Sequence, residues 1–138
     1  MAPLIPRRSP GEARLDPIAT TWGGLVASIG LMIGAGRDWP ARLALAAVSF
    51  GLAGFLAGVR AEGRRIAHAA GAWFMGYVIH AAFLALATII DVAGGPDAPE
   101  LSRGGGRDWL VAAVWALAFA LAGGAVANRW LRPAGRHR

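Results

Sequence analysis

The residues best suited to chemistry lie on one face of an apolar stretch in the middle of the chain. At 100° per residue, Tyr77, His80, Thr88 and Asp91 fall within about 80° of one another on a helix. A phenol, an imidazole, a hydroxyl and a carboxylate in one row could relay protons or line a polar passage. Imidazole suits such a role because its reference pKa, about 6.5, lets it change charge near neutral pH. The spacing therefore predicts a proton or solute path along this face.

A structural role for the same residues is the alternative. A neutral His80 can donate a ring N–H to a carbonyl or hydroxyl on a neighbouring helix, for example at Ser28 or Ser49, and Tyr77 can donate in the same way. An ionisable residue inside a membrane span is nevertheless a functional candidate by default. Both interpretations of His80 stay open at this point. His68 projects from the opposite side, near the start of the stretch, and is expected at the membrane–water interface.

The stretch that carries this face is one of four apolar blocks of about twenty residues. A helix of that length, at about 1.5 Å per residue, crosses a hydrocarbon core of about 30 Å. Hydrophobic residues make up 56% of the 138-residue chain and charged residues 16%, which is more apolar than a soluble domain. The blocks predict an all-α fold, an integral membrane four-helix bundle in one domain. Its expected parts are a disordered tail (1–16), four spans (about 17–36, 39–59, 66–90 and 109–128) within a domain of residues 17–130, and a basic tail (131–138).

Arginines predict how the spans are oriented. All 14 basic residues are arginines: three precede residue 17, three lie in residues 60–65 and four follow residue 128, so ten lie on one side and four on the other. Because Arg-rich loops stay in the cytoplasm, we expect a multi-pass protein with both termini inside (N-in, C-in). Arg-only basicity with abundant Ala and Gly is typical of a GC-rich bacterial genome, and hence of a bacterial plasma (inner) membrane. The candidates for holding an anionic lipid head group are Arg60, Arg64 and Arg65.

Composition and motifs exclude several classes of function. The chain has no cysteine, so it has no disulfide, thiolate metal site or Cys nucleophile. It has no H-E-x-x-H, G-x-S-x-G or P-loop motif, so nothing in the sequence predicts an enzyme, a metal or another cofactor. Its net charge of +6 is not arranged as a basic stripe with interleaved aromatics, so nucleic acid is not an expected partner. The expected partners are the lipid bilayer, its anionic lipids, and either further copies of the chain or a larger membrane complex.

Small residues form ridges along the predicted helices. Gly30 and Gly34 make a G-x-x-x-G pair in the first span, Gly54 and Gly58 repeat the device in the second, and Gly124 belongs to a ridge in the fourth. Such ridges let two helix backbones approach closely in lipid. The predicted role of these glycines is helix packing, against a helix of either the same chain or another one.

A four-residue segment occurs twice. Gly-Arg-Asp-Trp stands at residues 36–39 and again at 106–109, at the start of the second and fourth predicted spans. Each Asp is placed to cap a helix, and each Trp is placed at a membrane interface. Two explanations remain open: an internal repeat of two helical hairpins, or convergence on one favourable cap.

Residues 52–58 (LAGFLAG) and 64–71 (RRIAHAAG) are similar to segments of small Gly-rich four-span bacterial membrane proteins of unknown function. Those proteins show spaced Ala-Gly pairs at the end of one helix, a short basic turn, and a His with a small residue at the start of the next. The resemblance covers about twenty residues. It implies the same architecture and no activity.

The sequence favours a small structural or accessory membrane protein that associates through its Gly/Ala helix faces. Small-residue ridges on several helices leave faces on which a partner helix could pack. The alternative is a small proton-linked transporter or channel, with His80 as the titrating group and Tyr77, Thr88 and Asp91 beside it.

Overall fold

The computed structural model describes residues 15–35, 37–61, 64–94 and 106–131. It contains four helices, each long and apolar enough to cross a membrane: α1 (Pro17–Gly34), α2 (Trp39–Arg60), α3 (Arg65–Gly94) and α4 (Gly106–Trp130). The predicted all-α four-helix membrane bundle is therefore confirmed, and the chain is a small multi-pass membrane protein. Residues 1–14 and 132–138, which make up most of the two predicted tails, lie outside the described residues.

The helices α1 and α2 begin at the predicted residues 17 and 39, but the predicted capping by Asp38 and Asp108 differs from what the structure shows. Asp16 caps α1, because its carboxylate oxygen accepts a 2.9 Å hydrogen bond from the N–H of Ile18. Asp38 precedes α2 but makes no capping hydrogen bond with its side chain. Asp108 is not a cap either, since α4 begins at Gly106 and Asp108 lies in its first turn. The two Gly-Arg-Asp-Trp segments therefore start their helices in different ways.

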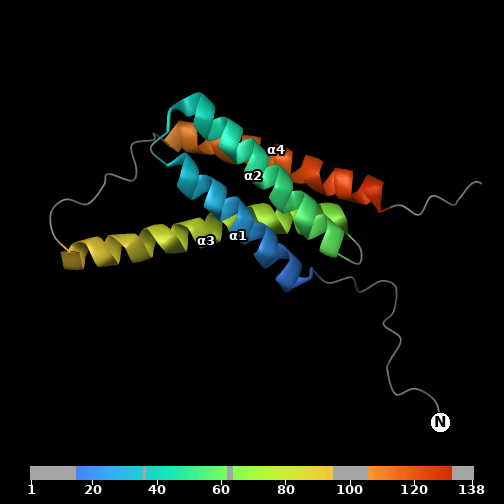
Figure 1. Cartoon of the computed structure of the whole chain (residues 1–138), viewed down its shortest axis with the longest axis horizontal. Helices are drawn as coiled ribbons and strands as arrows, with labels where there is room; N and C mark the ends of the chain where they lie inside the picture. Colours follow the sequence, from blue (N-terminus) through green and yellow to red (C-terminus); the bar gives the residue numbers. More distant parts are fainter. Residues whose placement is uncertain (1–14, 36, 62–63, 95–105, 132–138) are drawn as a thin grey trace, which may run out of the picture.

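The helices α2 and α3 are the two that contact every other described helix (Figure 1). α2 and α3 contact each other, and both α1 and α4 contact each of them. α1 and α4 do not contact each other in the described part of the chain. The hairpins α1–α2 and α3–α4 are therefore not equivalent in their packing, as a strict repeat of two hairpins would require.

The core consists mostly of alanines around one large side chain. Phe50, on α2, is completely buried and stacks on the ring of Tyr77 from α3, with 5.4 Å between ring centroids. Lipid tails are as apolar as the core, so close packing of small side chains contributes more here than removal of apolar surface from water. The buried residues of this cluster are Ala27, Ala46, Phe50, Ala53, Ala116 and Ala120.

α3 leaves the bundle half-way along its length. Ala69 and Ala72, in its first half, are fully buried. In the second half, Leu86 is 53% exposed and Ile89 is 67% exposed. Figure 1 shows the last turns of α3 lying well apart from the ends of the other three helices. Most of the described side chains in the second half of this helix are therefore exposed rather than packed against another helix.

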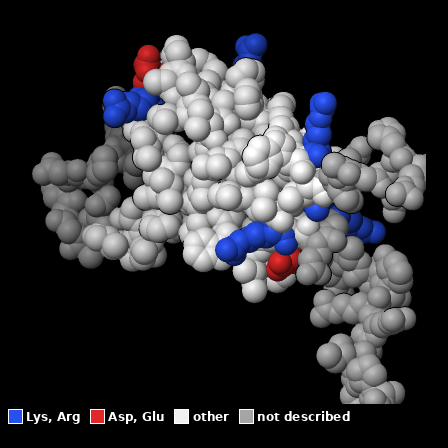
Figure 2. All heavy atoms as spheres, turned by 45° about the vertical axis from the view of Figure 1, so that its right-hand side comes forward, with Lys and Arg blue, Asp and Glu red and all other residues white. Residues whose placement is uncertain are grey.

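Charged side chains mark the two ends of the bundle. We call the end where α1 and α3 begin the arginine end; its described charged residues are Asp16, Arg60, Arg64, Arg65 and Arg129. Figure 2 shows a broad surface without charged side chains between the arginines at the edges of the visible face. An uncharged belt between two charged rims is what a membrane-spanning bundle presents to lipid.

Candidate functional site

The predicted polar path along α3 is not a connected chain of hydrogen bonds. Thr88 is exposed, and its hydroxyl donates a 2.8 Å hydrogen bond to the Leu84 carbonyl of its own helix. Nδ1 of His80 is buried and has no hydrogen-bond partner among the described residues. Asp91 belongs to the last turns of α3, but its side chain lies outside the described part. Within that part, no hydrogen bond joins Tyr77, His80 and Thr88 to one another.

Tyr77 is the centre of an aromatic cluster. Its ring stacks on Phe50 and meets the edges of Trp73 and Trp109, with 5.6 Å and 5.5 Å between the respective centroids. The indole N–H of Trp73 donates a 3.0 Å hydrogen bond to the backbone carbonyl of Ala113. These contacts join α2, α3 and α4, so the observed contacts of the Tyr77 ring are those of aromatic packing.

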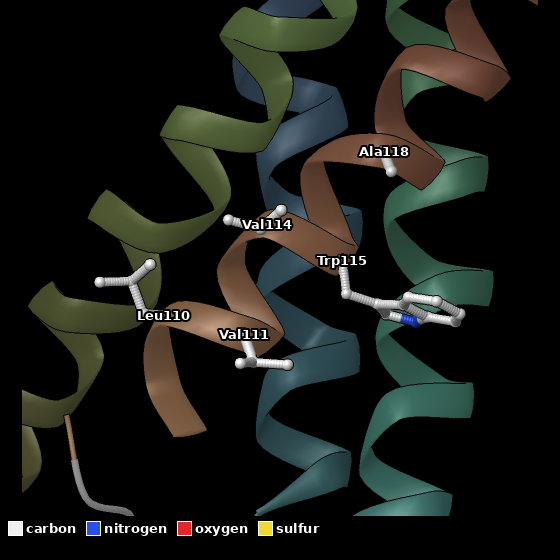
Figure 3. Close-up of a pocket in the computed structure, with 5 residues that line it drawn as sticks. All are labelled: Leu110, Val111, Val114, Trp115 and Ala118. Atoms are coloured by element: carbon white, nitrogen blue, oxygen red, sulfur yellow. The ribbon is translucent and has the colours of Figure 1, made fainter. Parts of the chain in front are cut away.

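A second indole ties α4 to α2. The N–H of Trp115 donates a 3.2 Å hydrogen bond to the Leu43 carbonyl, and Figure 3 shows the Trp115 ring turned toward α2. An indole N–H placed in lipid requires an acceptor, and a helix carbonyl has a second lone pair to offer. The sequence feature that could have predicted both interhelical hydrogen bonds is a tryptophan inside a span, at Trp73 and at Trp115. The acceptors could not be identified from the sequence.

An apolar hollow of about 350 Å³ lies on α4 and is not connected to the predicted path. All its lining residues belong to α4, and the leucine, valine and tryptophan side chains among them are exposed on the outside of the bundle. The hollow therefore faces lipid, and none of the predicted path residues lines it. The lining residues are Leu110, Val111, Val114, Trp115 and Ala118 (Figure 3).

Most of the predicted packing glycines stand at close approaches within this chain. A Cβ added to Gly54 would collide with the backbone of Ala120 on α4. Gly34 differs, because a Cβ there would make only an ordinary 3.6 Å contact with the Arg42 side chain. The other three glycines each face a side chain of another helix: Gly30 faces Ser49, Gly58 faces Ala127, and Gly124 faces Ala69.

The interhelical histidine is His68, which the sequence placed at the membrane interface. The structure buries His68, leaving only 2% of it exposed, because α1 lies across it at the arginine end. Its Nε2 accepts a 2.8 Å hydrogen bond from the backbone N–H of Asp16, and its Nδ1 lies 3.0 Å from the carbonyl of Arg64. In the sequence, such a hydrogen bond between helices was one of the two interpretations of His80. The hydroxyls of Ser28 and Ser49 instead donate to carbonyls of their own helices.

The three arginines predicted to hold a lipid head group lie in different surroundings at the arginine end. The guanidinium of Arg60 lies 5.7 Å from the ring centroid of Trp22, a cation–π contact. Nε of Arg65 is buried and has no hydrogen-bond partner in the described part of the chain. Arg64 has a φ of 44°, a left-handed conformation that side-chain-bearing residues rarely adopt. Binding of an anionic lipid by these residues stays a prediction.

No group of three or more metal-binding side chains occurs among the described residues. No protein-family model, no curated protein and no solved structure matches this chain. The similarity of residues 52–58 and 64–71 to four-span bacterial membrane proteins therefore stays a resemblance.

Proposed function

We propose that the protein is a structural or accessory membrane component that self-associates through the second half of α3. The observation that carries this proposal is that eight of the ten residues 81–90 are exposed, in a part of α3 that extends away from the other described helices. Gly54 and Gly124 already pack closely against other helices of the same chain. Association is therefore assigned to α3 rather than to the glycine ridges.

The exposed half of α3 has a face suited to a second helix. Ala81, Ala85 and Thr88 follow one another at intervals of four and three residues, so they share one side of the helix, and all three are exposed. Small residues at this spacing let two helices approach closely in lipid. His80 lies at the base of the same segment, and a two-fold axis would bring the same residues of two copies together. The His80 ring is only partly buried, so its accessible part could then contact the other copy.

Disulfide cross-linking tests the interface directly, since the chain contains no cysteine of its own. Ala81→Cys and Ala85→Cys should each give a covalent dimer on mild oxidation in membranes at low protein density. Val48→Cys is the matched control, because Val48 on α2 is 71% exposed but lies outside the proposed interface. Equal cross-linking at Val48 and at the two α3 positions would contradict the proposal, as would products of mixed mass that contain other proteins.

His80→Ala should weaken this association without unfolding the chain. The substitution removes the imidazole, whose Nδ1 has no described partner within the chain, so the internal packing loses no described hydrogen bond. The dimer fraction, measured by native mass spectrometry in lipid nanodiscs, is expected to fall while helix content by circular dichroism stays unchanged. An unchanged dimer fraction would remove His80 from the interface.

We also propose that both termini lie in the cytoplasm and that the arginine end faces it. The support is the distribution of arginines between the two sides of the spans. In intact cells, a membrane-impermeant maleimide should label Ser102→Cys, in the loop between α3 and α4, but not Ala134→Cys near the C-terminus. The reverse labelling pattern would overturn this orientation.

A proton-linked transporter or channel is the second candidate function. The observation that favours it is the buried Nδ1 of His80, which lies inside a span and has no hydrogen-bond partner among the described residues, because ionisable groups inside spans mark many ion pathways. On this reading, proteoliposomes containing the protein should take up protons or solute, and His80→Ala should abolish the flux. Absence of flux with the unmodified protein would refute this reading.

A further inference from the structure

We infer that His68 is a proton-operated latch that joins the start of α1 to the start of α3 only while its imidazole is neutral. The ring is nearly completely buried and contacts backbone groups on both sides. One side is the N–H of Asp16, which lies 52 positions earlier in the chain, and the other is the carbonyl of Arg64. The latch uses none of the residues of the proposed α3 interface, so the two proposals stand separately.

The backbone groups around His68 determine which ring nitrogen carries the hydrogen. A backbone N–H can only donate, so Nε2 must present its lone pair to Asp16. A carbonyl oxygen can only accept, so Nδ1 must carry the hydrogen that points to Arg64. Protonation places a second hydrogen on Nε2, where it faces the N–H of Asp16. The hydrogen bond between α1 and α3 is then lost.

The elements packed around His68 contribute further charged groups at the arginine end. α3 itself contributes Arg64 and Arg65, α2 contributes Arg60, and α4 contributes Arg129. Among the described residues of this end, the acidic group is Asp16 on α1, and its carboxylate already caps α1 through the N–H of Ile18. The cap uses Oδ1 of Asp16, so Oδ2 could pair with the imidazolium while the cap stays in place. With or without that pair, the N–H of Asp16 loses its acceptor on α3, and the first turn of α1 loses this hydrogen bond.

The opening is confined to the first turn by the contacts that follow it. One turn further along α1, the Thr20 side chain packs against Gly71, where a Cβ would lie 2.7 Å from the Thr20 methyl carbon. Two turns further along, Gly24 packs against Met75, with 2.6 Å between an added Cβ and that of Met75. These contacts do not depend on charge. Acidification therefore frees the chain before Thr20 and leaves the rest of the α1–α3 contact in place.

Amide hydrogen exchange at Asp16 tests the latch. The ¹⁵N-labelled protein in lipid nanodiscs is compared at about pH 8 and about pH 5, with exchange corrected for the intrinsic effect of pH. Loss of one hydrogen bond should reduce the protection of the Asp16 amide about fivefold at the lower pH. The amides of α2 should keep their protection. Equal protection of Asp16 at both pH values would overturn the inference.

Two variants separate the latch from a general effect of acid. In His68→Gln, the side-chain amide keeps an acceptor and a donor but does not titrate, so protection at Asp16 should no longer depend on pH. In His80→Ala, the other histidine of α3 is removed, and the pH response at Asp16 should persist. A pH response that persists in His68→Gln, or disappears in His80→Ala, would contradict the assignment. If His68→Gln does not fold, the unmodified protein and His80→Ala still decide the question.

Discussion

Replacing Gly54 by alanine should separate α2 from α4. The Cβ of the new alanine would lie 2.7 Å from the carbonyl carbon and 2.9 Å from the Cα of Ala120, whereas ordinary contacts of a Cβ begin at 3.4 Å. The obstacle is backbone, which cannot rotate away as a flexible side chain can. The two helices must therefore move apart by roughly 0.7 Å at this point, before the closer carbonyl oxygen is considered.

The cost follows from the packing that such a gap removes. A separation of about 0.5–1 Å loses a quarter to a half of the dispersion energy of each contact, and each contact contributes about 0.1–0.2 kcal/mol. The summed loss of dispersion energy over the many atom pairs between α2 and α4 is consistent with the cost of overpacking in protein cores, which is about 1–3 kcal/mol. Gly54→Ala should lower the free energy of unfolding by that amount.

Gly51→Ala is the matched control. Gly51 lies on the same helix three positions earlier, and a Cβ there would meet only the Phe119 carbonyl oxygen at 3.8 Å, an ordinary contact. Both variants gain the same intrinsic helix propensity from alanine. Unfolding equilibria measured in bicelles should show Gly54→Ala destabilised and Gly51→Ala unchanged or slightly stabilised. Equal stability of the two variants would refute the reasoning that close backbone approach, rather than flexibility, requires glycine at position 54.

Three further substitutions test other contacts by the same unfolding measurement. Trp73→Phe keeps an aromatic ring but removes the hydrogen bond to Ala113, so the free energy of unfolding should fall by about 0.6–2 kcal/mol. No change would mean that this hydrogen bond does not contribute to stability. Phe50→Ala should lower the free energy of unfolding by about 2 kcal/mol or more, because the cavity left by the buried ring costs about 24 cal/mol per Å³. A smaller loss would mean that the helices move together and fill the cavity. Arg64→Gly should stabilise the protein by up to about 1 kcal/mol, since glycine adopts a φ of 44° without strain, and destabilisation would show that the arginine side chain itself is needed.

The number and positions of the helices could be predicted from the sequence because the signal is strong in lipid. A block of about twenty apolar residues has few alternatives to a spanning helix, since the bilayer leaves no backbone polar group unpaired. The exact caps were harder to predict. Asp16 and Asp38 both precede a proline-containing first turn, but only Asp16 caps with its side chain. A cap depends on the path of the chain before the helix, which the residue type does not determine.

The candidate site was less predictable because its residues are far apart in the chain. In the sequence, a hydrogen bond between helices was one of two interpretations of His80, and His68 was expected at the membrane interface. The tie forms at His68, where α1 brings the backbone N–H of Asp16 within 2.8 Å. The acceptor and donor are backbone groups, which every residue carries, so no side-chain motif marks the partner. Only the packing of α1 on α3 brings the groups together.

The unequal lengths of the spans have a consequence for the bilayer itself. At about 1.5 Å per residue, the 18 residues of α1 extend about 27 Å, whereas the 26-residue span of α3 extends about 39 Å. No single hydrocarbon thickness matches both helices when they stand upright, so the longer one has to tilt. Because α3 is one continuous helix whose first half is packed in the core, a change in its tilt would also move that half, so the bilayer around its exposed second half has to adapt to the extra length.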